Sequence, residues 1–311
     1  MRALLYHGPG DLRVEEVPRP EPGVGDVLVQ VEVALTDGTD AKAFRRGHPL
    51  LLENLPSPFG HEFCGYDVAT GRRVVAANSA PCGLCAPCRR GEETLCENLR
   101  PFLNGAYAEY LLVPERIAAR NLLPVPPALT SEVAALVEPL ACCLRGIERA
   151  QVEPGQSVAV LGPGPIGLML CAAAKDAGAR VVAVGGRAER RELARQFGGE
   201  PGDGAGADVV VEAVGSAQAW HDALQLVRPG GTVVFFGGRE VAVDTFRLHY
   251  EELTLRGSFH HTPRHVRAAL AFLASGAHPW ERLITHEVGL EGVAPLFADP
   301  PRDLLKAAVR P

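Results

Sequence analysis

Residues 157–167 read SVAVLGPGPIG, a short apolar run that ends in glycines at positions 162, 164 and 167. A helix-like segment follows to Ala177, and a second apolar run occupies residues 180–184. In such a strand–turn–helix unit the first glycine permits a tight turn, the second lets the backbone approach a pyrophosphate, and the third lets the helix pack on the strand. The helix N-terminus offers unpaired N–H groups to phosphates. An ordinary glycine-rich turn is the alternative, but the flanking elements favour a dinucleotide site formed by Gly162, Gly164, Pro165, Ile166 and Gly167.

The second apolar run ends without the acidic residue expected there. Val184 is followed by two glycines and an arginine, with two more arginines one turn further on. A carboxylate at this point would bind the ribose 2′-hydroxyl of NAD, whereas small residues and arginine leave room and positive charge for a 2′-phosphate. A solvated arginine cluster at a helix start is the alternative. We predict that NADP is preferred, with NAD possible, and that the cofactor contacts Gly185, Gly186, Arg187 and Arg191.

The segments on either side of this motif extend the same pattern. Apolar runs at residues 208–214 and 232–236 alternate with helix-like segments, which predicts a parallel sheet. The intervening segment FGGEPGDGAG, residues 197–206, has one proline and five glycines. It has no helical period and is too short for a strand plus a helix, so we predict that one crossover helix is replaced by a loop or short strand. Valines at 27, 29, 31 and 33 alternate with other residues, which predicts a half-buried strand in a first third that is mainly β.

Length and composition limit the class of protein. A chain of 311 residues with 47% hydrophobic and 22% charged residues suggests two folded domains. The net charge is −6 and the cations are scattered, which argues against nucleic acid or an anionic membrane surface as a partner. No apolar run reaches about 18 residues, and the first residues lack the apolar core of a signal peptide. We therefore expect a cytoplasmic protein.

Four of the eight cysteines lie within the segment PCGLCAPCRRGEETLC, residues 81–96. Thiols this close together in a chain of this kind favour a metal site over disulfides. Four thiolates close a tetrahedral zinc shell and leave no open position, as in structural zinc sites. An iron–sulfur cluster or free thiols are the alternatives. We predict a structural zinc held by Cys82, Cys85, Cys88 and Cys96.

Candidate ligands for a second, catalytic metal are dispersed along the chain. An imidazole and carboxylates with one open position would suit a Lewis-acid zinc. Three of the candidates also have a purely structural explanation: Asp37 can form a turn, His61 can be a buried core histidine and Glu138 can be an acid at a helix N-terminus. The candidate ligands are Asp37, His61, Glu62 and Glu138.

Together these motifs resemble the zinc-dependent medium-chain alcohol dehydrogenase/reductase superfamily, and within it the polyol (sorbitol) and sugar dehydrogenase branch. The cysteine segment resembles the structural zinc lobe of that family, GHEFCG at 60–65 its metal-binding His-Glu, and EPLA at 138–141 the glutamate of the polyol branch. The resemblance implies an α/β fold in which a mainly β, GroES-like catalytic domain at 1–144 carries the zinc lobe. A doubly wound Rossmann domain would occupy 145–259, and residues 260–311 would return to the first domain.

The resemblance also assigns roles. His61 would be a zinc ligand, and Glu62 and Glu138 a ligand and an exchanging or neighbouring carboxylate, in an order that the sequence leaves open. Thr39 matches the hydroxyl residue that passes the substrate proton to solvent. Asp37 stands where the family usually has cysteine. The catalytic residues would be Asp37, Thr39 and His61.

We therefore expect a zinc-dependent, NADP-preferring dehydrogenase of a secondary alcohol, a polyol or sugar, that forms a homodimer or homotetramer. The alternatives are a sister enzyme acting on another alcohol or aldehyde, and a zinc-free or catalytically silent nucleotide-binding protein.

Overall fold

The computed structural model describes residues 1–52, 54–238 and 240–311. The chain forms two compact units. The first comprises residues 1–139 and 262–311, and the second comprises residues 140–261. Among the described residues, no helix has both the length and the apolar character needed to cross a membrane.

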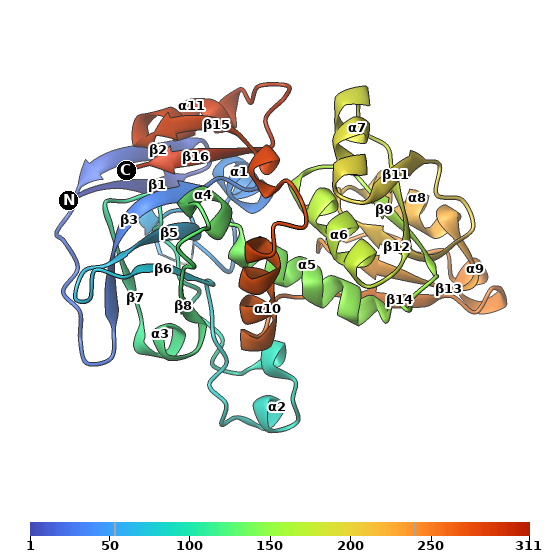
Figure 1. The fold of residues 1–311 in the computed structure, drawn as a ribbon, viewed down its shortest axis with the longest axis horizontal. Coiled ribbons are helices and arrows are strands. Elements are labelled where there is room, and N and C mark those ends of the chain that lie inside the picture. The colour runs from blue at the N-terminus through green and yellow to red at the C-terminus, as the bar shows by residue number, and fades with distance from the viewer. Residues whose placement is uncertain (53, 239) are drawn as a thin grey trace. The chain divides into compact units, whose positions relative to one another are not determined.

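The first unit contains two β-sheets (Figure 1). In the smaller sheet, β1 (Arg2–Gly8) pairs with both β2 (Asp11–Glu16) and β4 (Ser57–Pro58). The strand order of the larger sheet is β15 (Ile284–Gly289), β16 (Lys306–Arg310), β3 (Val27–Leu35), β5 (Glu62–Asp67), β6 (Arg73–Ala76) and β8 (Leu122–Pro124), with β7 (Tyr110–Val113) also paired to β3. Val29, Val31 and Val33 of β3 are buried and Gln30 is exposed, as the alternation predicts, but Leu28 and Ala34 are buried too, so one-sided burial holds only in the middle of the strand.

Helices of the first unit connect and cover these sheets. Apolar rings form part of the core: Phe59 stacks on Tyr6 with 5.8 Å between ring centroids and also contacts Tyr107 and Phe297. The helices are α1 (Gly38–Arg46), α2 (Ala86–Arg89), α3 (Glu115–Asn121), α4 (Ser131–Ala134), α10 (Pro263–Ala274) and α11 (Leu290–Ala298), with the 3₁₀ helices η1 (Glu93–Leu95) and η2 (Trp280–Leu283). Helix α5 (Val137–Ala150) begins in the first unit and ends in the second.

The second unit contains a six-stranded parallel sheet (Figure 1). Its order is β11 (Gly199–Gly202), β10 (Arg180–Val184), β9 (Ser157–Leu161), β12 (Ala207–Glu212), β13 (Val227–Phe235) and β14 (Thr254–Gly257). Numbered along the chain, this is the order 3-2-1-4-5-6 of the Rossmann fold, which binds dinucleotides where the strand order reverses. The connecting helices are α6 (Pro165–Asp176), α7 (Ala188–Gln196), α8 (Ala217–Leu226) and α9 (Thr245–Tyr250).

One crossover helix is missing, as the composition of residues 197–206 predicts. Residues 203–206 are all described, and they join β11 to β12 without a helix. A Cβ built on Gly204 would lie 2.6 Å from Cγ2 of Val184 and 2.9 Å from Cβ of Ala159. Those residues belong to β10 and β9, the two strands between β11 and β12. The 203–206 connection therefore crosses directly on the face of the sheet.

Candidate functional site

The glycine turn between β9 and α6 has the geometry expected of a dinucleotide site. Gly162 has φ = 90°, which favours glycine. A Cβ on Gly167 would lie 2.0 Å from the carbonyl oxygen of Gly162, so only glycine permits this approach of helix to turn. A Cβ on Gly164 would meet nothing within 4 Å, so the backbone at this point is open to a ligand. Pro165 is at the start of α6, where its fixed φ favours the helix, and Ile166 follows it.

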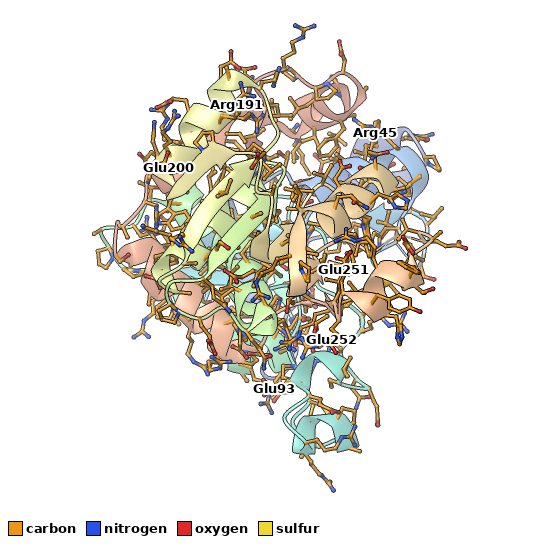
Figure 2. All side chains as sticks on the ribbon, turned by 90° about the vertical axis from the view of Figure 1, so that its right-hand side faces the viewer. Arg45, Glu93, Arg191, Glu200, Glu251 and Glu252 are labelled. Carbon is orange, nitrogen blue, oxygen red and sulfur yellow. The ribbon has the colours of Figure 1, made fainter. Side chains whose placement is uncertain are left out.

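The end of β10 lies against this turn. Gly185 and Gly186 have φ values of 82° and 76°, and a Cβ on Gly186 would lie 2.4 Å from Cγ of Pro163. Arg187 is the N-cap residue of α7, and Arg191 lies one turn further on in the same helix (Figure 2). Nη1 of Arg191 donates a hydrogen bond of 2.8 Å to the Gly186 carbonyl. The structure thus brings together the two segments that the sequence predicts to bind the cofactor, and places two arginines beside the glycine turn.

A third segment of this site was not found by sequence reasoning. Glu212, the last residue of β12, is fully buried, and its Oε1 accepts hydrogen bonds from the backbone N–H groups of Val214 (2.7 Å) and Gly215 (2.6 Å). These bonds hold the loop that contains Val214. Val214 packs against Gly162, because a Cβ built on Gly162 would lie only 2.5 Å from Cγ2 of Val214. The only sequence signal was an acid at the end of an apolar run, which does not reveal what the acid binds.

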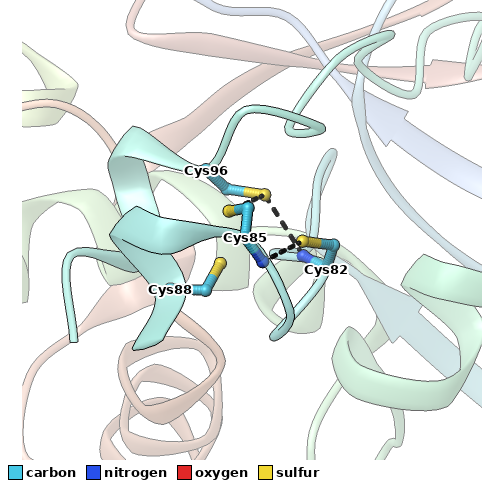
Figure 3. A group of neighbouring side chains, drawn as sticks. All are labelled: Cys82, Cys85, Cys88 and Cys96. Carbon is cyan, nitrogen blue, oxygen red and sulfur yellow. Dashed lines mark hydrogen bonds between the residues drawn. The ribbon is translucent and has the colours of Figure 1, made fainter. Parts of the chain in front are cut away.

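The four predicted cysteines converge in one small lobe (Figure 3). Each offers a sulfur, and all four sulfurs lie within 4.8 Å of one another. Cys85 is the N-cap residue of α2, Cys88 lies in α2, and Cys96 follows η1. Backbone N–H groups of Leu84 and Cys85 donate to the Cys82 sulfur and lower the pKa of that thiol to about 5. The lobe can hold one metal ion with four sulfur ligands, which suits zinc.

A second group of side chains that could hold a metal ion lies where β3 ends and β5 begins. Asp37, His61 and Glu62 each offer a ligand atom, and the three atoms lie within 4.8 Å of one another. Asp37 has two roles, because its Oδ1 caps α1 by accepting from the Asp40 N–H (2.7 Å), whereas its Oδ2 lies 3.8 Å from Nε2 of His61. The turn-forming and ligand interpretations of Asp37 are therefore compatible.

Two residues that sequence reasoning missed orient His61. Nδ1 of His61 lies 3.2 Å from Oδ1 of Asp40, and the Tyr107 hydroxyl donates to Oδ2 of the same carboxylate. A carboxylate at one imidazole nitrogen orients the ring and directs the other nitrogen toward a metal. Burial lowers the pKa of His61, but the charges of Asp40 and Asp37 raise it well above its usual value. A cation that binds this imidazole must therefore displace a proton.

Lys306, also missed, pairs with Glu62. Its ammonium nitrogen lies 2.7 and 2.6 Å from the two carboxylate oxygens of Glu62, and both side chains are buried. Burial raises the pKa of Glu62 to about 8, although the charge of Lys306 acts in the opposite direction. These residues are 244 positions apart in the sequence, so local motifs do not reveal the pairing.

The two remaining predicted site residues lie beside this group. Glu138 is buried in the first turn of α5, and its charge raises the pKa of both His61 and Glu62. Glu138 does not belong to the group formed by Asp37, His61 and Glu62. Thr39, in the first turn of α1, is half-buried. Burial acts to raise the pKa of Asp37, but the charges of His61 and Lys306 and hydrogen bonds from Asp40 and Thr39 lower it.

The donor set fits zinc. One imidazole and two carboxylates are ligands that zinc accepts, and three protein ligands leave a fourth position for substrate, as in catalytic sites. Lys306 and a protonated His61 balance charge of the surrounding carboxylates, and a zinc ion would take the place of the His61 proton.

Two family profiles match this chain. The family profile of the alcohol dehydrogenase GroES-like domain matches residues 23–127, and that of the zinc-binding dehydrogenases matches residues 199–275. L-Galactonate-5-dehydrogenase of Escherichia coli is 30% identical, over 92% of this chain and 91% of the relative. Erythritol/L-threitol dehydrogenase of Mycolicibacterium smegmatis is 32% identical, over 93% and 91%.

Solved structures show the same fold over the whole chain. A zinc-binding dehydrogenase of Sinorhizobium meliloti, bound to NADP, is 32% identical with a TM-score of 0.88, covering 100% of this chain and 99% of its own. Alcohol dehydrogenase of Thermus sp. ATN1 is 32% identical with a TM-score of 0.85 and the same coverage. The profiles, the polyol and sugar dehydrogenases among the relatives and the matching fold place this chain in the zinc-binding, medium-chain alcohol dehydrogenase family, in its polyol and sugar branch.

Proposed function

We propose that this protein is a zinc-dependent dehydrogenase that interconverts a secondary alcohol of a polyol or sugar with its carbonyl and prefers NADP. The observation that carries the proposal is the group formed by the half-buried Asp37 and the buried His61 and Glu62, whose ligand atoms lie within 4.8 Å of one another. The two named polyol and sugar dehydrogenases to which the chain is similar support the substrate class.

When bound, zinc supplies a Lewis acid and the nicotinamide a hydride acceptor. Asp37 and His61 would hold the metal, and Asp40 and Tyr107 keep His61 in the orientation that presents Nε2. Thr39 is half-buried beside Asp37, so its hydroxyl can carry the substrate proton from the buried site toward solvent. Glu138 adds negative charge that favours a bound cation.

The preference for NADP is inferred from the end of β10. The residues directly after Val184 are glycines and not a carboxylate. Arg187 and Arg191 provide positive charge where a 2′-phosphate would lie. Guanidinium groups bind phosphate well because their donors form a planar fork. The similar Sinorhizobium meliloti structure holds NADP, which supports the same choice here.

We expect the purified protein to contain about two zinc ions per chain, one in the cysteine lobe and one at Asp37 and His61. A screen of polyols, sugars and simple alcohols with NADP and with NAD tests the reaction directly. Turnover of a polyol or sugar with NADP supports the proposal. About one zinc per chain and no turnover would instead indicate a zinc-free or silent nucleotide-binding protein, and turnover of other alcohols or aldehydes alone would indicate a sister enzyme. The cytoplasmic location and the homodimer or homotetramer remain predictions.

A further inference from the structure

Lys306, the first residue of β16, is the cation buried beside the proposed metal site. Its side chain is 1% exposed, and that of Glu62 is 0% exposed. The ammonium group donates to both oxygens of Glu62 and, at 3.0 Å, to the carbonyl oxygen of Thr36. All three ammonium hydrogens can therefore be used in these bonds.

The backbone keeps Lys306 in this position. The N–H of Thr36 donates to the carbonyl of Ala307 (3.0 Å), and the N–H of Ala307 donates to the hydroxyl of Thr36 (2.8 Å). Thr36 directly precedes Asp37. The residue that carries the ammonium group is thus tied to the residue next to a metal ligand, and Lys306 cannot withdraw without breaking several buried hydrogen bonds.

The three candidate ligands differ in whether they keep an atom available for a metal ion. Asp37 uses one oxygen to cap α1 and keeps the other toward His61, and His61 uses Nδ1 toward Asp40 and keeps Nε2 toward Asp37. Glu62, in contrast, has both oxygens bonded to an ammonium group. A divalent cation that approached Glu62 would share it with a fixed positive charge, and the two cations repel each other.

We propose that Lys306 is a positioning residue that competes with the metal ion for Glu62, so that Asp37 and His61 are full ligands and Glu62 is an auxiliary one. This inference rests on the proposed function, because it requires a metal at Asp37 and His61. Lys306 then serves to keep one ligand position of the metal available for substrate.

The experiment measures metal affinity and does not depend on turnover. Co²⁺ is exchanged into the Asp37–His61 site while the cysteine lobe keeps zinc, and its dissociation constant is obtained by chelator competition at one fixed alkaline pH. The cobalt d–d absorption spectrum reports the number of ligands. The variants are Lys306→Met, the charge-balanced Lys306→Met/Glu62→Gln and Asp37→Asn. Lys175→Met, which removes an exposed charge in α6, is the control for net charge.

We expect Lys306→Met to bind cobalt roughly tenfold more tightly or better, since repulsion is removed and Glu62 is released to the metal. Its spectrum should change toward a higher coordination number. The double variant should bind within about fivefold of the wild type, because a pair of opposite charges is removed together and neither residue is a full ligand. This variant leaves no lone buried charge, so it keeps the test available if Lys306→Met does not fold. Lys175→Met should resemble the wild type.

Two results would overturn the inference while leaving the proposed function intact. One is a double variant that loses cobalt as severely as Asp37→Asn, which would make Glu62 a full ligand. The other is a Lys306→Met variant whose affinity and spectrum equal those of the wild type. A wild type that binds no metal outside the cysteine lobe would overturn both the inference and the proposed function.

Discussion

Replacing Gly204 with alanine should destabilise the second unit through two separable effects. Gly204 has φ = 70°, a conformation in which a Cβ costs about 1–2 kcal/mol. The same Cβ would lie 2.6 Å from Val184 and 2.9 Å from Ala159, both on the sheet. Overpacking of this kind costs about 1–3 kcal/mol. We therefore expect Gly204→Ala to lose about 2–5 kcal/mol.

Gly206 provides a matched control in the same connection. Its φ is 72°, but a Cβ there would meet nothing within 4 Å. Gly206→Ala should therefore lose only the backbone contribution, about 1–2 kcal/mol. The difference between the two variants measures how tightly the 203–206 connection packs on the sheet.

Fluorescence can follow this unit alone. The chain has two tryptophans, and Trp220 of α8 stacks on Phe235 of β13 with 3.6 Å between ring centroids. In a Trp280→Phe background, the emission of Trp220 follows unfolding of the second unit. Each kcal/mol should lower the melting temperature by about 3–5 °C for a unit of this size. Equal losses in Gly204→Ala and Gly206→Ala would refute the packing of the connection on the sheet.

Three further substitutions test the proposed sites. Asp37→Asn keeps the α1 cap but removes the charge, so the variant should lose most catalytic zinc and nearly all turnover, with little change in melting temperature. Full metal content and full activity in this variant would mean that Asp37 only caps the helix. Arg187→Ala should raise the KM for NADP by about ten- to a hundredfold and leave the KM for NAD unchanged. Arg195→Ala is the control, because it removes a surface arginine near the end of the same helix that pairs with Glu192, and it should change neither KM value. Cys88→Ala should loosen the cysteine lobe, lower its zinc content and lower the melting temperature. Cys171→Ala, the control, should keep the zinc. An unchanged zinc content in Cys88→Ala would contradict a metal in the lobe.

The features that could be predicted from the sequence are those defined by neighbouring residues. The glycine turn, the arginines after β10 and the four cysteines each lie within a short segment, because a turn or a zinc lobe is a local structure. The missing crossover helix was also predictable, since five glycines and a proline within ten residues do not form one.

The surroundings of the metal site could not be predicted in this way. Asp40 lies in the same short segment as Asp37, yet its role depends on His61, which β5 brings beside β3 by antiparallel pairing. Tyr107 reaches Asp40 from 67 positions away. Lys306 depends on the register of β16 against β3, which a single sequence does not specify.

The pairing of Glu62 with Lys306 also has a consequence for biosynthesis. Residues 140–261 form one uninterrupted segment, so the second unit can fold as soon as that segment has left the ribosome. The first unit cannot, because β16 lies between β15 and β3 and carries the lysine that pairs with Glu62, 244 residues later in the chain. Until residue 306 emerges, the nascent chain lacks both β16 and the lysine that pairs with the Glu62 carboxylate. The second unit is thus able to fold well before the first, whose larger sheet is completed only when β16 takes its place between β15 and β3.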